Sequence, residues 1–268
     1  MTTNLSTTDP LAELLSVNAE NVQEQKLSLL YKGPPGSGKT HNWLTFPGKT
    51  VALYTDKNMA TVTEAIGRGV EARLVIPKSW FEWADVFVPA VRNRMVDAEN
   101  IVVDTVDMLT KLMWREIQGT RDKLRIQDFG TGLDRMTRTI NDVCSAATHQ
   151  PGERSYNIVM CSHVSDVTDD SGSLVKTTCS VMGAFKDVVE SLFDYVLLTA
   201  AEVKTDIVEG KAQKTKSFFC HTIPPTRYHT VKAPAYFPHE IEGTWQGLQS
   251  ALALKPGPAV ATETTETT

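Results

Sequence analysis

The residues with the clearest chemistry form the stretch GPPGSGKT near the start of the chain. It matches GxxxxGK[ST], in which glycines let successive backbone N–H groups wrap a phosphate chain at the start of a helix. Lys39 supplies a positive charge for the phosphates in binding and catalysis, and the Thr40 hydroxyl is a ligand for Mg²⁺. An apolar run precedes the stretch and a helical pattern follows it, as the motif requires. We therefore expect a site for ATP and Mg²⁺ formed by Gly33, Pro34, Pro35, Gly36, Ser37, Gly38, Lys39 and Thr40.

A metal-bound triphosphate also needs a carboxylate at the end of a neighbouring buried strand. The run NIVVD ends in Asp104, which is the expected partner of Mg²⁺. Asp107 follows one turn later and is interpreted as a charge at the start of a helix. Because Thr105 and not a glutamate follows Asp104, the acid that activates water must come from elsewhere. The run VALYT leads into Asp56, our candidate general base, with a turn or helix-cap aspartate as the alternative.

A polar pair, Ser162 and His163, follows the apolar run that starts at Asn157. The carboxyl edge of an open α/β sheet is where ligands gather, so the pair is placed to touch the γ-phosphate or a bridging water. Either side chain would then report the presence of that phosphate. A purely structural histidine is the alternative.

These residues require a sheet that holds them at one edge. Short apolar runs alternate with longer amphipathic ones, which is typical of an α/β fold with a mostly parallel sheet flanked by helices. A C-terminal β-hairpin is predicted around Glu209 and Gly210, and the segment 165–176 is expected to be a polar loop. Strands are predicted at 27–31, 50–55, 73–77, 100–105, 157–163 and 194–200. Helices are predicted after Lys39 and at 58–68, 81–96, 108–117, 132–148 and 184–193.

Length and composition favour one large domain, because 268 residues with 41% hydrophobic content can bury a full core. We expect a tail with a short helix at 1–24, one domain at 25–253 and a disordered tail at 254–268. The net charge of −5 excludes a protein that coats nucleic acid by bulk charge, so any such site must be a local patch. Four cysteines without paired spacing indicate reduced thiols and a cytoplasmic location. No apolar run predicts a membrane span, and no membrane partner is expected.

The ordered segments resemble a known family over about residues 27–240: the phage RecA-like P-loop ATPases of the Sak single-strand annealing type. The segments are GPPGSGKT, ALYTD, VEARLVIPKSWFEW, NIVVDTVDML, DFGTGLDRM, NIVMCSHV, GAFKDVVESLFDYVLL and RYHTVKAPAYFP. The resemblance implies a RecA-like ATPase that binds single-stranded DNA and forms a homo-oligomeric ring or filament. It also implies annealing or strand exchange coupled to Mg-ATP.

Two positions depart from the pattern of that family. Asp56 stands where the family usually has glutamate, which leaves a shorter base. Lys232 is what remains of a basic pair near the last core strand. The resemblance implies that it reaches across a subunit interface to the neighbour's γ-phosphate, where it would stabilise the transition state. A surface lysine is the alternative.

The resemblance also implies DNA contacts from the loops after the Asp104 and His163 strands. Basic residues of the segment 115–138 are one set of candidates, and the hairpin segment 201–232, with a net charge of +3, is the best local patch. A solvated hairpin face is the alternative. The candidate DNA-binding residues are Arg121, Lys123, Arg125, Lys176, Lys211, Lys214 and Lys216.

Two other classes of protein stay open at this point. A P-loop phosphotransferase would use Arg121, Lys123 and Arg125 as a lid, although the strand that ends in Asp56 argues against it. A nucleotide-gated module that hydrolyses weakly or not at all is the second. It would assemble on DNA or on a partner such as a single-strand-binding protein, and the departures at Asp56 and Lys232 favour it.

Overall fold

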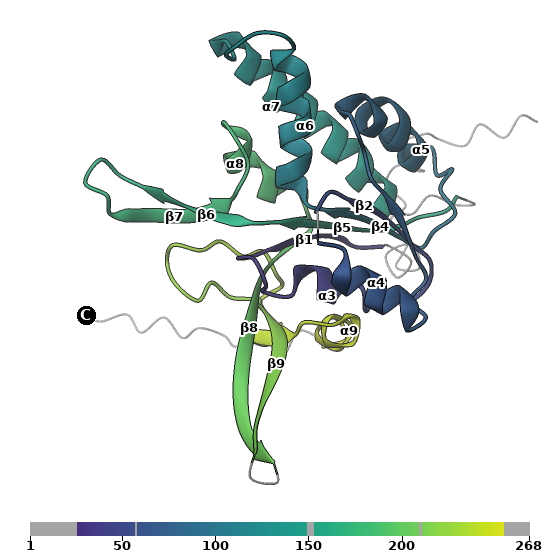
Figure 1. The fold of residues 1–268 in the computed structure, drawn as a ribbon, viewed down its shortest axis with the longest axis vertical. Coiled ribbons are helices and arrows are strands. Elements are labelled where there is room, and N and C mark those ends of the chain that lie inside the picture. Colours follow the sequence, from purple (N-terminus) through teal and green to yellow (C-terminus); the bar gives the residue numbers. More distant parts are fainter. Residues whose placement is uncertain (1–25, 57, 149–152, 209–210, 255–268) are drawn as a thin grey trace, which may run out of the picture.

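The computed structural model describes residues 26–56, 58–148, 153–208 and 211–254. An eight-stranded sheet with the order β10-β9-β8-β1-β5-β4-β2-β3 runs through the molecule (Figure 1). Its parallel strands are β1 (Ser28–Lys32), β2 (Thr50–Tyr54), β3 (Ala72–Val75), β4 (Asn100–Asp104), β5 (Asn157–Ser162) and β8 (Tyr195–Val208). The antiparallel strands β9 (Lys211–His221) and β10 (Glu240–Glu242) extend one edge.

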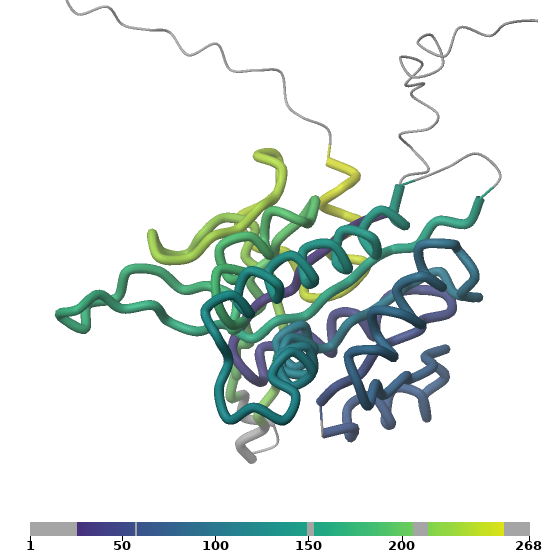
Figure 2. The backbone as a smooth tube through the Cα atoms, turned by 90° about the horizontal axis from the view of Figure 1, so that it is seen from above, coloured from purple at the N-terminus to yellow at the C-terminus, as the bar shows by residue number. Residues whose placement is uncertain are grey.

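Helices cover both faces of the sheet, and Figure 2 shows the long helix α7 lying across it. One face carries the π-helix η1 (Glu82–Phe87), α5 (Val88–Arg92), α6 (Val106–Gln118), α7 (Ile126–Cys144), α8 (Phe185–Val188) and the 3₁₀ turns η2 (Ser145–Ala147) and η3 (Val189–Leu192). The other face carries α3 (Lys39–Trp43), α4 (Ala60–Gly67) and α9 (Trp245–Leu252). Every residue of β1, β2, β4 and β5 is buried. This double burial is why these strands are near-continuous apolar runs in the sequence.

The predicted α/β class and the parallel strands are confirmed, with ends that differ by one or two residues for most strands. The C-terminal hairpin is also confirmed, and it is longer than predicted because β8 pairs with β9 from Leu198 to Val208. The predicted tails at 1–24 and 254–268 lie outside the described residues, except for Leu254. In the ranges that the structure describes, no helix is both long and apolar enough to cross a bilayer.

The prediction of a polar loop at 165–176 was wrong. The chain there forms a separate two-stranded hairpin, β6 (Val164–Thr168) with β7 (Leu174–Cys179), that projects from the body (Figure 1). All five side chains of β6 are partly or fully exposed, so the strand lacks the apolar alternation that marks a half-buried strand. Helix α7 also begins earlier than predicted, at Ile126, because the Asp128 carboxylate accepts the backbone N–H of Arg125 and caps the first turn.

Candidate nucleotide-binding site

The GPPGSGKT stretch forms a loop between the buried strand β1 and the start of α3. Its first N–H, from Gly33, donates to the Ser162 carbonyl of β5 at 3.2 Å, which ties the loop to the carboxyl edge of the sheet. Gly38 has a φ of +98°, and a Cβ there would lie 2.4 Å from Cδ1 of Phe218. Only glycine accommodates both the backbone conformation and this close approach. The loop therefore has the shape that the motif predicts.

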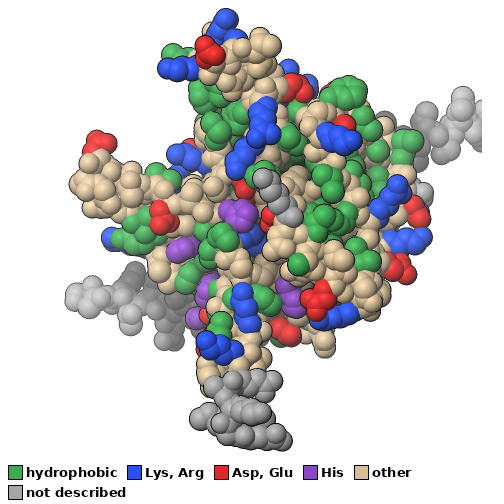
Figure 3. Space-filling view, in the orientation of Figure 1, with side chains coloured by type: hydrophobic (Ala, Val, Ile, Leu, Met, Phe, Trp, Pro, Cys, Tyr) green, Lys and Arg blue, Asp and Glu red, His purple; other side chains and the backbone are tan. Residues whose placement is uncertain are grey.

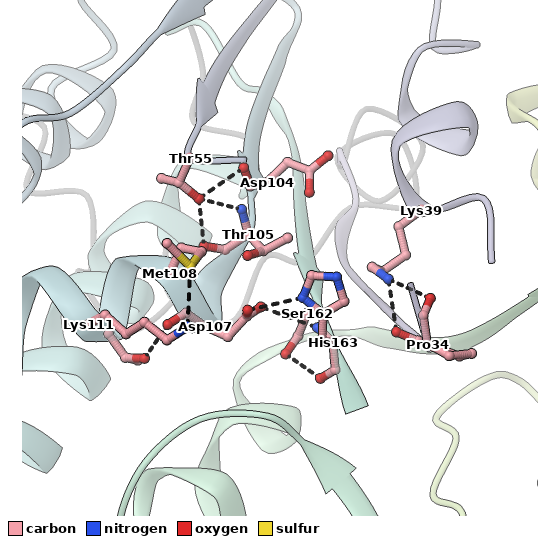
Figure 4. Close-up of polar contacts among 12 residues, drawn as sticks. Pro34, Lys39, Thr55, Asp104, Thr105, Asp107, Met108, Lys111, Ser162 and His163 are labelled. Carbon is pink, nitrogen blue, oxygen red and sulfur yellow. Dashed lines mark hydrogen bonds and ion pairs between the residues drawn. The ribbon is translucent and has the colours of Figure 1, made fainter. Parts of the chain in front are cut away.

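The Lys39 ammonium lies inside this loop (Figure 4). It donates to the carbonyl of Gly33 at 2.8 Å and to that of Pro34 at 2.9 Å. Burial lowers the pKa of Lys39 from its ordinary value, because a charged ammonium loses its hydration there. A bound phosphate group would supply the opposite charge that the two neutral carbonyl oxygens do not.

The two predicted Mg²⁺ ligands are in direct contact. The Thr40 hydroxyl donates to a carboxylate oxygen of Asp104 at 2.7 Å, and the indole N–H of Trp43 donates to the same oxygen at 2.9 Å. Burial raises the pKa of Asp104, and the two hydrogen bonds oppose that rise. Within the described residues no group of three or more His, Cys, Asp or Glu side chains could hold a metal alone. The pair fits Mg²⁺, which takes few protein oxygens and completes its shell with phosphates and water.

His163 is held by Asp107, a partner that the sequence interpretation missed. The His163 Nδ1 lies 3.0 Å from one Asp107 oxygen, and its backbone N–H donates to the other at 3.2 Å (Figure 4). Burial raises the pKa of Asp107, but the contacts with His163 outweigh it and leave that pKa below its ordinary value. Asp107 does lie in the first turn of α6, as predicted, and the neighbouring positions of β4 and β5 in the sheet add this second role.

A cavity of about 330 Å³ joins these groups. Its lining includes the predicted residues Lys39, Thr40, Asp56, Asp104 and His163. The lining also includes residues that the sequence interpretation did not place there: His41, Tyr54, Asn58, Thr61, Thr105, Lys216 and Phe218. The volume lies within the range of small-molecule sites.

A comparison with known protein families covers most of the chain. The AAA_24 family model, described as an AAA domain, matches residues 25–230. The chain belongs to the AAA_24 family. A P-loop AAA domain implies nucleotide binding, which agrees with the loop, the Thr40–Asp104 pair and the cavity. A search of curated proteins found no match.

In this AAA_24 domain Asp56 is exposed at the cavity. Its carboxylate accepts the backbone N–H of Asn58 at 3.2 Å, which is the contact expected of a turn aspartate, the alternative interpretation of this residue. Ser162, in contrast, is fully buried, and its hydroxyl donates to the carbonyl of His163 at 2.9 Å. Ser162 does not line the cavity, so of the predicted pair only His163 faces it.

Lys232 lies away from the cavity of its own chain. Its backbone pairs with Val196 near the start of β8, and its ammonium donates to the carbonyl of Phe193. Phe193 precedes β8, whereas the phosphate loop follows β1 at the opposite end of these parallel strands. Lys232 therefore makes an internal contact in this structure, and its role across a subunit interface stays a prediction.

The predicted DNA-binding residues lie on three separate projections (Figure 1). Arg121 pairs with Asp128 at 2.8 Å in the turn between α6 and α7, where Lys123 and Arg125 are exposed. Lys176 on β7 forms an ion pair with Asp187. Lys214 and Lys216 are exposed on β9, and the side chain of Lys211 lies outside the described residues. Figure 3 likewise shows basic side chains spread over this face and not gathered in one patch.

None of the basic residues in the turn between α6 and α7 lines the cavity, so the prediction that they form the lid of a phosphotransferase gains no support.

Proposed function

We propose that this AAA_24 protein binds and hydrolyses Mg-ATP as a RecA-like phage recombination protein of the Sak type. The contact between Thr40 and Asp104, beside Lys39 in one cavity, is the observation that carries the nucleotide part. The proposal extends to a homo-oligomer that binds single-stranded DNA and promotes annealing or strand exchange. That extension is supported by the resemblance of the ordered segments and by the exposed lysines and arginines of the projections.

Hydrolysis needs a base, charge stabilisation and a positioned water. Water attacks the terminal phosphorus, the bond from that phosphorus to the bridging oxygen breaks, and a proton of the water passes to the base. We assign the role of base to Asp56, which is exposed at the cavity. Lys39 holds the phosphates, and Mg²⁺ bound by Thr40 and Asp104 would neutralise charge on the phosphate oxygens. To His163, which Asp107 holds, we assign the role of positioning the water or reporting the terminal phosphate.

Two substitutions test the nucleotide part. Lys39→Ala should remove ATP binding, measured by titration calorimetry with Mg²⁺. Asp56→Asn keeps an oxygen that can accept the Asn58 N–H but removes the base, so it should keep ATP binding and lose turnover. Wild-type protein that binds no ATP would refute the proposal, and unchanged turnover in Asp56→Asn would remove Asp56 as the base.

The DNA part is tested by fluorescence anisotropy with a labelled oligothymidylate, ATP and Mg²⁺. Binding should weaken steeply between roughly 50 and 200 mM salt, because phosphate contacts release counterions. Replacing Lys123 and Arg125 with alanine should weaken binding further, whereas Lys49→Ala, at an exposed lysine that precedes β2, should not. Absence of binding at the lower salt concentration would exclude the DNA role.

One observation favours a second candidate, a nucleotide-gated module that does not hydrolyse. Asp56 is exposed and already engaged with Asn58, which is the arrangement of a turn residue. If wild-type protein binds ATP and DNA without releasing phosphate, and only Lys39→Ala impairs DNA binding, this second candidate replaces the first.

A further inference from the structure

Lys216 lies beside the phosphate loop, although the sequence placed it in a DNA-binding patch. Strand β9 pairs with β8, and β8 pairs with β1, the strand that leads into the loop. This order brings Lys216 to the loop across 180 positions of sequence, and its ammonium donates to the Gly36 carbonyl at 2.7 Å. Lys216 also lines the nucleotide cavity.

Phe218 holds β9 in this position. It follows Lys216 by two positions and so lies on the same face of the strand. Its ring packs so closely on Gly38 that no Cβ fits between them, and its centroid lies 4.7 Å from that of His41 in α3. The Lys216 ammonium is 5.0 Å from the centre of the same ring. The ring therefore fixes both the strand and the approach of the ammonium to the loop.

The present partner of Lys216 is a weak one for a full positive charge. Among the residues that the structure describes, none of the ion pairs involves Lys216, and its hydrogen bond goes to a neutral carbonyl. A phosphate oxygen is a stronger acceptor, because a hydrogen bond between two charged groups is shorter and stronger. Lys39 has the same arrangement, with its ammonium on the Gly33 and Pro34 carbonyls. The loop thus has an ammonium group on each of two segments of its backbone.

We propose that Lys216 is a nucleotide-binding residue that contacts the phosphate chain of the ATP bound to its own chain. On ATP binding the ammonium exchanges the Gly36 carbonyl for a phosphate oxygen. The site then carries two lysines from one chain, Lys39 from the loop and Lys216 from the hairpin. This inference rests on the proposed ATP binding and goes beyond it, because it adds a binding residue outside the loop motif.

The test measures ATP affinity by titration calorimetry in the presence of Mg²⁺. Lys216→Ala should weaken binding about tenfold or more, as expected for the loss of a hydrogen bond between charged groups. Lys216→Gln keeps an N–H donor for Gly36 but no charge, and should bind ATP as weakly as Lys216→Ala. Lys216→Arg keeps the charge and should recover much of the affinity. Lys204→Ala is the matched control, because Lys204 lies on β8 of the same hairpin and pairs with Glu202.

Three outcomes would overturn the inference. If Lys216→Gln binds ATP like wild type, the residue only supports the loop. Equal losses in Lys216→Ala and Lys204→Ala would show a general effect of hairpin charge. If a mixture of Lys39→Ala and Lys216→Ala chains regains ATP binding, Lys216 serves a neighbouring chain and not its own. Wild-type protein that fails to bind ATP would instead refute the proposed function, so the two failures are distinguishable.

Discussion

Gly38 joins the phosphate loop to strand β9, and its replacement by alanine tests how the site is assembled. The φ of +98° at this position costs an L-residue about 1–2 kcal/mol. The added Cβ would also lie 2.4 Å from Cδ1 and 2.7 Å from Cγ of Phe218, so the ring or the strand must move. Overpacking of this kind costs about 1–3 kcal/mol. Gly38→Ala should therefore lower the free energy of unfolding by about 2–5 kcal/mol.

Gly69 provides a control for the backbone contribution. It has the same φ of +98°, and an added Cβ there would meet no heavy atom within 4 Å. Gly69→Ala should therefore cost only the backbone part, about 1–2 kcal/mol. Urea denaturation followed by circular dichroism gives both free energies of unfolding, and their difference isolates the contact with Phe218. ATP affinity should fall in Gly38→Ala and not in Gly69→Ala.

The double variant Gly38→Ala/Phe218→Ala completes the comparison. Removing the ring makes room for the added Cβ, so Gly38→Ala should cost less in the Phe218→Ala background than in wild type. Equal destabilisation by Gly38→Ala and Gly69→Ala would refute this reasoning. It would mean that β9 does not pack on the loop, and the placement of Lys216 would lose its basis.

Three further predictions concern buried charges. Burial raises the pKa of Asp104, so the ligand-free fold loses stability as the pH rises from the ordinary to the raised pKa. Asp104→Asn should therefore raise the melting temperature of the ligand-free protein at pH 7, by about 2–4 °C for each kcal/mol of stability gained. The same variant should bind Mg-ATP more weakly in calorimetry. The pKa of Asp107 is lowered in the fold, so its ionised carboxylate stabilises the fold above the ordinary pKa, and this stabilisation is lost as the pH falls through the lowered pKa. Asp107→Asn should cost about 1–2 kcal/mol in urea denaturation at pH 7, and the deficit should shrink below about pH 4; a deficit independent of pH would contradict the role of His163. Lys32 is fully buried and forms an ion pair with Glu190 at 2.7 Å. Lys32→Met leaves the Glu190 charge unpaired and should lower the free energy of unfolding by about 3 kcal/mol, whereas Lys32→Met/Glu190→Gln should lower it by less. Equal losses in the two variants would show that the ion pair contributes nothing.

Much of the fold could be predicted because its central strands are buried on both faces. Such strands must be apolar along their whole length, so the runs around Leu29 and Val102 stand out without any knowledge of their neighbours. Strand β6 and the first half of β7 are partly or fully exposed and contain no such run, so their composition is that of a loop. Burial pattern, and not strand propensity, decided which strands were predictable.

The phosphate loop and Asp104 could be recognised from local sequence, because each is encoded within a few consecutive residues. Which residues join them depends on the fold. Asp107 and His163 are separated by 56 positions and meet because β4 and β5 are neighbours in the sheet. Lys216 and Gly36 are separated by 180 positions and meet because β8 lies between β1 and β9 in the sheet. Strand order sets both contacts, and it depends on the packing of the whole sheet, which no local pattern of residues specifies.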